Sequence, residues 1–401
     1  MQTKTPATLL LLALLSLPAT ADPAFERCIE QLRVPARSAG VLDATFTQHT
    51  RDLRPDLSVI ERLNHQPEFR TPIWDYLAGL VDDERIRQGQ ALLAQHAELL
   101  ERIQQRHGVD PAIVVAIWGV ESNFGQTLGR FSLPQALGTL SCMGRRQTFF
   151  RAEFFAALRI LQAGHVEPEQ LVGSWAGAFG HTQFMPSTFE RLAQDFDGDG
   201  RADLIGNPAD ALASTAHFLR RAGWQTGQTW GFEVRLPDGL STAGEGRRSK
   251  RPRHEWVARG LTLVDGSALP ADLGQAGLIT PAGRSGPAFL LLRNFDALFG
   301  YNPAESYALA IGHLADRLRG ADPFVTPWPT DDGPLSRAER RELQALLILR
   351  GHEIGAIDGM LGARSRAAIL QEQTRLGFAA SGRGGQQLLQ ALRRPAQSTA
   401  Q

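Results

Sequence analysis

The position best suited to chemistry is Glu121, a carboxylate at the end of a long uncharged run. Pro111–Val120 carries no charge, and Asp110 before Pro111 is typical of a helix start. A helix that is apolar on every face is expected inside the protein, so Glu121 would be desolvated near a partially negative helix end. Both effects raise a carboxyl pKa, as a general acid near neutral pH requires. The alternative is an ordinary surface glutamate beyond a core helix.

A second candidate segment, residues 173–189, combines glycines with aromatic and polar side chains. Glycine lets the backbone approach a ligand closely. Trp175, Phe179 and Phe184 provide flat faces. Hydrogen bonds are available from Ser174, His181 and Gln183. This mixture suits a sugar, whose rings have apolar faces and polar edges. A tight turn between helices with aromatic core residues is the alternative.

The acid at Glu121 has no second carboxylate close to it in the sequence. Apart from Glu121, residues 108–143 contain only Asp110, and residues 173–189 contain none. A retaining or inverting glycosidase usually needs two carboxylates. The sequence therefore predicts a lone acid, although a carboxylate from farther along the chain stays open.

Acidic residues at alternate positions predict a metal site. Asp195, Asp197 and Asp199 precede Gly200, as at the start of an EF-hand calcium loop. A strict loop would place Glu at its twelfth position, where Gly206 stands. A cluster of Asp-Gly turns without metal is the alternative.

Composition and the chain ends limit the function classes. Lys and Arg number 42, as do Asp and Glu, so net charge does not indicate a nucleic-acid binder. The basic stretch 247–254 is either a solvated loop or a means of attracting an anionic polymer.

Residues 1–21 resemble a signal peptide without a following lipid-anchor cysteine, which predicts an exported, periplasmic protein with no stable membrane anchor. Cys28 and Cys142 form a disulfide or remain two buried thiols.

The hydrophobic periodicity predicts a mainly α-helical protein with a small β-containing insertion. Strands are expected at 230–236 and 256–257, and helices again at 288–299 and 303–318. The proline-rich residues 321–334 are expected to form a linker. The expected divisions are a signal peptide (1–21), a main helical body (22–320) with its insertion at about 225–287, the linker (321–334), a small domain (335–392) and a tail (393–401).

The two candidate segments together resemble the B-type lytic murein transglycosylases, which include membrane-bound lytic transglycosylase B. Glu-Ser-Asn-Phe-Gly begins at Glu121, and the glycine-rich segment follows about fifty residues later. The resemblance covers roughly residues 24–320 in order and spacing. Its further matches are Ala136–Leu140, Arg145, Arg146, Asp210–Ala216, Gly223, Trp224, Tyr301 and Asn302.

This resemblance implies a lysozyme-like helical core that cleaves peptidoglycan between N-acetylmuramic acid and N-acetylglucosamine. Glu121 would serve as the sole general acid and base, with 1,6-anhydromuramyl products and no cofactor for the chemistry. The resemblance also implies the remaining site residues: Ser174, Gln183, Tyr301 and Asn302 for the sugar, and Asp195, Asp197, Asp199, the Arg201 carbonyl and Asp210 for a structural calcium ion.

The chain departs from the family pattern at two positions. Phe218 stands where the family commonly has tyrosine, which puts one sugar contact in doubt but not the cleavage step. His181 stands at a variable position, so no catalytic role is assigned to it.

Residues 335–392 resemble the three-helix peptidoglycan-binding domain. Its expected core is Leu346, Leu347, Ile354, Ile357 and Leu361. Such a domain would tether a monomeric enzyme to glycan strands and raise its effective concentration at the wall. Two other functions stay open: a muramidase that hydrolyses the same bond with water, and a non-catalytic peptidoglycan-binding protein.

Overall fold

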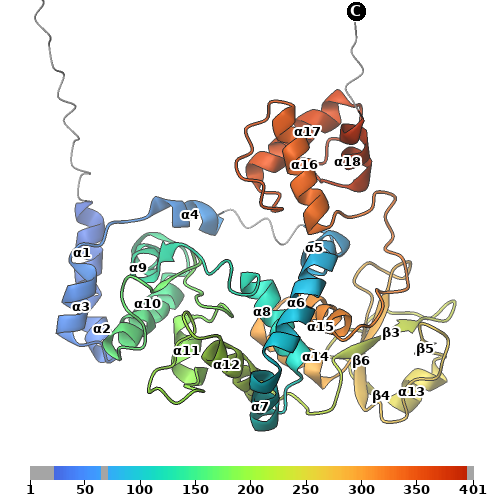
Figure 1. The fold of residues 1–401 in the computed structure, drawn as a ribbon, viewed down its shortest axis with the longest axis horizontal. Coiled ribbons are helices and arrows are strands. Elements are labelled where there is room, and N and C mark those ends of the chain that lie inside the picture. Colours follow the sequence, from blue (N-terminus) through green and yellow to red (C-terminus); the bar gives the residue numbers. More distant parts are fainter. Residues whose placement is uncertain (1–21, 65–70, 395–401) are drawn as a thin grey trace, which may run out of the picture.

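The computed structural model describes residues 22–64 and 71–394 and is mainly helical (Figure 1). The expected signal peptide lies outside the described residues, as do residues 395–401 of the expected tail. Helices and small sheets build one large body, and three helices form a separate domain at the top of the view. The expected fold class is therefore confirmed.

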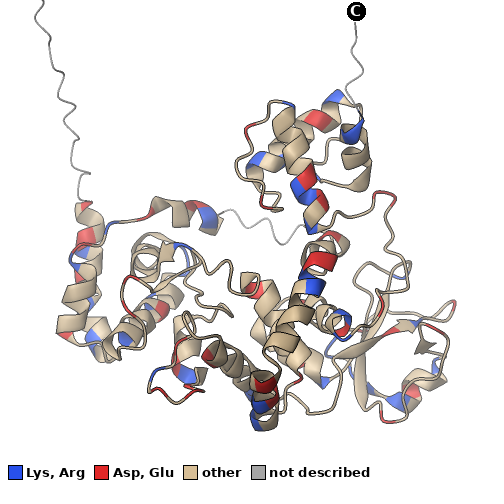
Figure 2. Cartoon of the chain, in the orientation of Figure 1, with Lys and Arg blue, Asp and Glu red and all other residues tan. Residues whose placement is uncertain are grey.

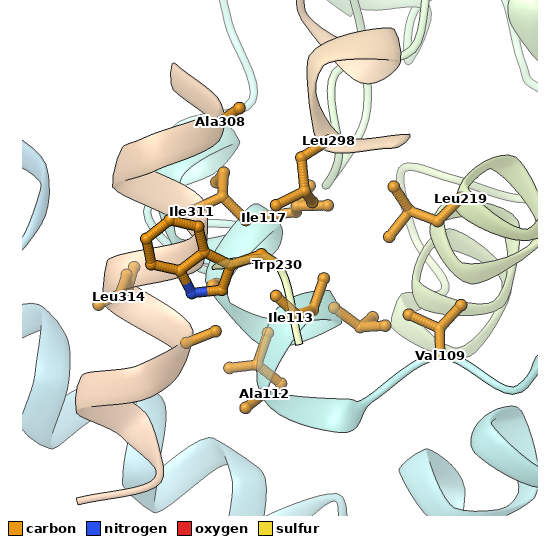
Figure 3. Close-up of a cluster of buried hydrophobic side chains, with 14 of the residues drawn as sticks. Val109, Ala112, Ile113, Ile117, Leu219, Trp230, Leu298, Ala308, Ile311 and Leu314 are labelled. Carbon is orange, nitrogen blue, oxygen red and sulfur yellow. The ribbon is translucent and has the colours of Figure 1, made fainter. Parts of the chain in front are cut away.

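The centre of the large body is built around α8 (Pro111–Ser122). Asp110 caps this helix as expected, because its carboxylate accepts the Ala112 amide at 2.7 Å. The helix is surrounded by apolar side chains from its neighbours, including Leu219, Trp230, Leu298 and Ile311 (Figure 3). Its neighbours in this core are α5 (Ile73–Leu80), α6 (Asp83–Gln95), α7 (Ala97–His107), α12 (Pro208–Arg221), α14 (Arg293–Tyr301) and α15 (Glu305–Leu318).

A second apolar core lies around α9 (Leu133–Met143) and α10 (Gln147–Gln162). Cys28 and Cys142 form a disulfide that joins the first helix to α9. The other elements of this part are α1 (Pro23–Gln31), α2 (Arg33–Ser38), α3 (Asp43–Thr50), α4 (Leu57–Asn64), α11 (Pro186–Leu192) and the short antiparallel pair β1 (Phe131–Ser132) and β2 (Val172–Gly173).

The two cores meet at Phe218 and Tyr301. Both side chains are partly buried and pack against each core, with their ring centroids 4.7 Å apart. Residues that line this junction therefore come from distant parts of the sequence. The junction also lies beside the carboxyl end of α8, where Glu121 stands.

The insertion forms an antiparallel five-stranded sheet with its own apolar core. In the order β4-β6-β7-β3-β5, its strands are β4 (Arg251–Pro252), β6 (Gln275–Ile279), β7 (Ala288–Leu291), β3 (Gly231–Arg235) and β5 (Thr262–Leu263). In the register of the central strands, Leu291 pairs with Gly231 on one side and with Gly277 on the other.

Two local predictions in the insertion are wrong. Residues 288–291 form β7 rather than the start of a helix, because this fully buried apolar run has no periodicity that separates strand from helix. The sheet thus extends beyond residue 287. Trp256 lies in α13 (Arg253–Ala258) rather than in a strand, where its indole Nε1 donates to the Ala276 carbonyl at 3.0 Å.

The basic stretch 247–254 is largely paired within the molecule. Arg247 and Lys250 both contact Asp296 of α14, at 2.7 and 3.1 Å. The Arg247 guanidinium also lies 3.8 Å from the Phe299 ring centroid. These contacts attach the insertion to the helix that ends at Tyr301, which favours a structural role for the stretch over attraction of an anionic polymer.

The C-terminal domain consists of α16 (Arg337–Leu349), α17 (Ala363–Arg375) and α18 (Gln386–Arg393). Its core differs from the expected one, because Ile357 is 47% exposed in the loop after α16. That loop is held by the buried Gln344, which donates to the Ala356 and Met360 carbonyls and accepts the Gly359 amide. The buried core is formed by Leu335, Leu343, Leu347, Ile354, Ala368, Ile369, Leu388, Leu389 and Leu392, with Leu346 and Leu361 partly buried beside it.

Acidic and basic residues are interspersed over most elements (Figure 2). In the described residues, no helix has both the length and the apolar character needed to cross a membrane.

Candidate active site

Glu121 lies at the carboxyl end of α8 with its carboxylate against Tyr307 of α15. The Tyr307 hydroxyl donates to Glu121 Oε1 at 2.6 Å. Burial raises the pKa of Glu121 to about 7, and the hydrogen bond from Tyr307 opposes part of that rise. No ion pair reaches this carboxylate within the described parts of the chain. A carboxyl with a pKa near 7 is populated in both its protonated and ionised forms near neutral pH, which suits a group that gives and accepts a proton.

The turn after Glu121 is tightly specified. Asn123, Phe124 and Gly125 all have positive φ, at 50°, 58° and 83°. The Ser122 hydroxyl donates to the His181 carbonyl at 2.6 Å and accepts the Gly125 amide at 2.8 Å. A Cβ at Gly125 would lie 2.3 Å from His181 Cε1, so both conformation and space require glycine here. This turn joins the end of α8 to the glycine-rich segment.

His181 contributes to the scaffold of this turn. Its Nδ1 accepts a hydrogen bond from the Trp118 indole at 3.0 Å, and burial lowers its pKa. A neutral imidazole that accepts from an indole is already engaged. This geometry agrees with the absence of a catalytic assignment for His181.

Tyr301 lies next to Tyr307, and their rings are parallel within 4° at a centroid distance of 6.4 Å. The Tyr301 hydroxyl donates to the Thr182 carbonyl at 2.6 Å. Burial raises the pKa of Tyr301 well above its usual value, and the negative charge of Glu121 adds to the shift. Tyr301 thus connects the glycine-rich segment to the acid.

The other predicted sugar-binding residues differ in how free their polar groups are. Gln183 has a φ of 51°, and its Nε2 donates to the Leu128 and Gly180 carbonyls at 3.2 and 2.9 Å. The Ser174 hydroxyl oxygen accepts the Ala178 amide at 3.0 Å, which leaves its proton available. Asn302 is exposed just after α14. The structure therefore brings Tyr301 to Glu121, and it uses Ser174 and Gln183 to shape the glycine-rich loop.

The predicted metal ligands lie in the loop between α11 and α12 and, for Asp210, in the first turn of α12. Asp195, Asp197 and Asp210 gather with one carboxylate oxygen each within 4.8 Å of the others. Asp210 is buried, which raises its pKa; amides from Asp203 and Phe196 oppose that rise, while Asp197 and Asp195 add to it. Clustered carboxylate oxygens suit a hard cation such as Ca²⁺.

Asp199 is not part of that group of three. Its carboxylate accepts the Arg201 amide at 2.8 Å, as Asp195 and Asp197 also accept amides of this loop.

Comparison with known proteins follows the same division of the chain. A family described as the transglycosylase SLT domain matches residues 24–316, which is most of the chain and contains every predicted site residue. The chain belongs to this transglycosylase family. A second family, described as a peptidoglycan binding domain, matches residues 336–392. Both resemblances seen in the sequence are confirmed.

Individual members of the transglycosylase family align with much of this chain. Membrane-bound lytic murein transglycosylase B of Escherichia coli (strain K12) is 32% identical over 251 residues, which are 61% of this chain and 66% of that protein. This match thus spans just under two thirds of the curated relative. A crystal structure of SltB3 from Pseudomonas aeruginosa in complex with NAG-anhNAM-pentapeptide is 46% identical, with a TM-score of 0.75, and covers 93% of this chain and all of that one. Escherichia coli Slt35 in complex with calcium is 28% identical, with a TM-score of 0.63, and covers 74% of this chain and 93% of that one.

Two residues at the site were missed in the sequence. Tyr307 lies on a different helix from Glu121, 186 positions away, and no local pattern connects them. The one available signal was composition, because the chain has only three tyrosines and two of them stack here. Ser122 is part of the Glu-Ser-Asn-Phe-Gly motif, but the sequence does not show its hydrogen bonds to the His181 carbonyl and the Gly125 amide.

Proposed function

We propose that this family member is a lytic transglycosylase that cleaves the β-1,4 bond between N-acetylmuramic acid and N-acetylglucosamine in peptidoglycan. The observation that carries the proposal is the Glu121 carboxyl, which has a pKa near 7 and accepts from Tyr307, with no ion pair from residues 22–64 or 71–394. The relative crystallised with NAG-anhNAM-pentapeptide supports the same product class.

In the first step, Glu121 gives its proton to the glycosidic oxygen as the bond to the anomeric carbon breaks. Positive charge develops at the anomeric carbon, and the carbonyl oxygen of the substrate's own N-acetyl group stabilises it, as in other substrate-assisted glycosidases. The ionised Glu121 carboxylate still accepts the Tyr307 hydrogen bond, which stabilises the charge it has acquired.

In the second step, Glu121 removes the proton from the muramyl 6-hydroxyl. The 6-oxygen attacks the anomeric carbon and displaces the N-acetyl oxygen, which closes the 1,6-anhydro ring. Glu121 regains its proton, so no water is consumed. One residue with a pKa near the working pH performs both transfers, which explains why a second carboxylate is not required.

The proposed sugar-binding roles follow from the polar groups that the loop and its neighbours leave available to a ligand. Ser174 is proposed to donate its hydroxyl proton to the sugar or its N-acetyl group, and Asn302 to contact the sugar from the exposed end of α14. Gln183 retains its carbonyl oxygen for the ligand, because its amide protons serve the loop. Tyr301 is proposed to flank the cleavage point through its ring.

The products test this proposal. Purified protein is expected to release muropeptides from sacculi that are about 18 Da lighter than reducing muropeptides in a mass spectrum, because ring closure excludes water. Reducing-end products would instead identify a hydrolytic muramidase. No release at all would favour a non-catalytic peptidoglycan-binding protein.

We also propose that Asp195, Asp197 and Asp210 hold a structural calcium ion, with Asp199 and the Arg201 carbonyl as further oxygen ligands. The relative crystallised with calcium supports this. A cation would neutralise the negative charge at the start of α12. This helix contains Phe218, whose ring packs against that of Tyr301. No cofactor is proposed for the chemistry itself.

Calcium is therefore expected to raise the melting temperature of the chelator-treated protein, since a ligand that binds only the folded state stabilises it. Isothermal titration calorimetry should show uptake that Asp195→Asn weakens more than Asp199→Asn, because Asp199 lies outside the group of three carboxylates. The absence of uptake at millimolar calcium would contradict the proposal.

We propose that the enzyme works in the periplasm as a monomer. Its proposed partner is the glycan strands of peptidoglycan. The C-terminal domain is proposed to bind the wall and keep the enzyme near its substrate. Nothing in the balanced charge of the chain favours nucleic acid.

A further inference from the structure

The C-terminal domain is packed against the large body rather than hanging from a free linker. Residues 321–334 contain no helix or strand, yet they are bound along their length. The Val325 and Thr326 amides both donate to the Glu233 carboxylate at 2.8 Å, and the Phe324 ring stacks on His313 at 3.7 Å. Trp328 lies against Trp74, with ring centroids 6.4 Å apart.

Arginines of the C-terminal domain complete this packing. Arg383 forms a double hydrogen bond to the buried Asp75 of α5, at 2.7 and 2.8 Å, and a further one to Asp332 at 2.6 Å. Arg340 donates to the Asp75 carbonyl, and Arg341 pairs with Glu84 of α6. In Figure 2, charged segments of α16 lie close to those of α5 and α6. Double arginine–carboxylate pairs set orientation as well as proximity.

One arginine of this interface reaches the catalytic motif, by which we mean residues 121–125. Arg337, in the first turn of α16, donates through Nη1 to the Asn123 side-chain oxygen at 2.6 Å. Asn123 is two residues from Glu121 and adopts the left-handed conformation that ends α8. Its side-chain amide donates in turn to Gln126 Oε1 at 2.7 Å. The C-terminal domain thus holds the turn that follows the acid.

The turn has a strained backbone that needs such support. Asn123 and Phe124 are consecutive non-glycine residues with positive φ, a conformation that L-residues rarely adopt. The Phe124 ring packs back on Gly119, where a Cβ would lie 2.7 Å from the ring atoms. A change at Asn123 is therefore transmitted to the last turn of α8, which carries Glu121.

Arg337 is itself held in place by its own domain. A Cβ at Gly359 would lie 2.9 Å from Arg337 Cγ, so the loop anchored by Gln344 packs directly on the arginine stem. The same loop exposes Ile357 and Met360. Arg337 thus touches the catalytic motif at one end and this loop of the proposed wall-binding domain at the other.

We infer that Arg337 is a positioning residue for catalysis: through Asn123 it maintains the turn that orients Glu121, so that the C-terminal domain supports turnover besides binding the wall. This inference rests on the proposed function. Arg337 makes no contact with the Glu121 carboxylate, so its effect is geometric and leaves the protonation of Glu121 unchanged.

The test uses the full chain and soluble peptidoglycan fragments as substrate. Arg337→Ala is expected to lower kcat roughly 3- to 20-fold, with KM and sacculus binding little changed, because a misplaced acid slows the chemistry and not the binding. Arg337→Lys should recover part of the loss, since an ammonium group also donates to Asn123. The midpoint of the pH profile should stay where it is in the unaltered protein.

Arg341→Ala is the matched control, because this arginine also crosses the interface but pairs with Glu84 of α6 instead of Asn123. Its kcat is expected to match that of the unaltered protein. Equal losses in both variants would show a general effect of docking and overturn the inference, as would an unchanged kcat in Arg337→Ala.

A double-mutant cycle with Asn123→Gly identifies the route, because glycine keeps the left-handed turn but removes the acceptor oxygen. Adding Arg337→Ala to that variant is expected to cause no further loss, and additive losses would contradict an effect through Asn123. If the unaltered protein releases no product, the proposed function fails. If it is active and Arg337→Ala is equally active, only the role of Arg337 fails.

Discussion

Replacing Glu121 by Gln is expected to lower muropeptide release by roughly 10²- to 10⁴-fold, the usual contribution of a general acid or base. Glutamine has the same shape and its carbonyl oxygen still accepts from Tyr307, but it neither gives nor takes the proton. Release of muropeptides from sacculi, measured by chromatography, checks this result.

The fold should survive this change, because the amide carries no charge that burial penalises. The melting temperature at pH 7.5 is expected to be at least that of the unaltered protein, and sacculus binding should remain. Glu98→Gln is the matched control, since Glu98 is exposed in the first turn of α7. Turnover by Glu121→Gln close to that of Glu98→Gln would remove Glu121 from the mechanism.

Turnover should decline as the pH rises through about 7, because the first step needs the protonated carboxyl and burial places the pKa of Glu121 there. Above that pH, each further unit is expected to cost about tenfold in kcat/KM. Tyr307→Phe removes the donor that lowers this pKa, so the decline should move to higher pH. The measurement is the pH profile of kcat/KM on soluble glycan fragments.

Tyr301→Phe separates this effect from a general loss of the tyrosine cluster. Tyr301 is partly buried and stacks on Tyr307, but its hydroxyl donates to the Thr182 carbonyl instead of the acid. Its substitution is expected to change the rate without moving the pH of the decline. A profile that moves equally in both variants, or moves to lower pH in Tyr307→Phe, would show that the tyrosine donor does not set the acidity of Glu121.

The location of the acid was predictable because its cause is local. The uncharged run Pro111–Val120, capped by Asp110, has no polar face to offer to water, so it had to become a buried helix. Desolvation of the residue at the end of that helix followed as a prediction, with an ordinary surface glutamate as the alternative. Family resemblance added the transglycosylase family and the C-terminal domain, and both comparisons agree with it.

Local apolar runs were less informative where burial was complete. Residues 288–291 are buried on both faces of the sheet, so their apolar pattern has no period that distinguishes a strand from a helix. Ile357 shows the opposite error: its apolar character predicted a core position, but the backbone of its loop is held by Gln344 and leaves the side chain outside. Apolarity alone does not specify which side chain the tertiary structure encloses.

Sequence by itself therefore indicated the candidate acid, its buried helix, a glycine-rich segment suited to a sugar ligand and the two families that follow one another along the chain. Tertiary structure alone decided which donor reaches the acid, whether the two cysteines form a disulfide and where the C-terminal domain packs. Tyr307 and Arg337 come from 186 and 214 positions away from their partners Glu121 and Asn123. Such contacts depend on how whole helices pack, and no pattern within a few turns of chain encodes that packing.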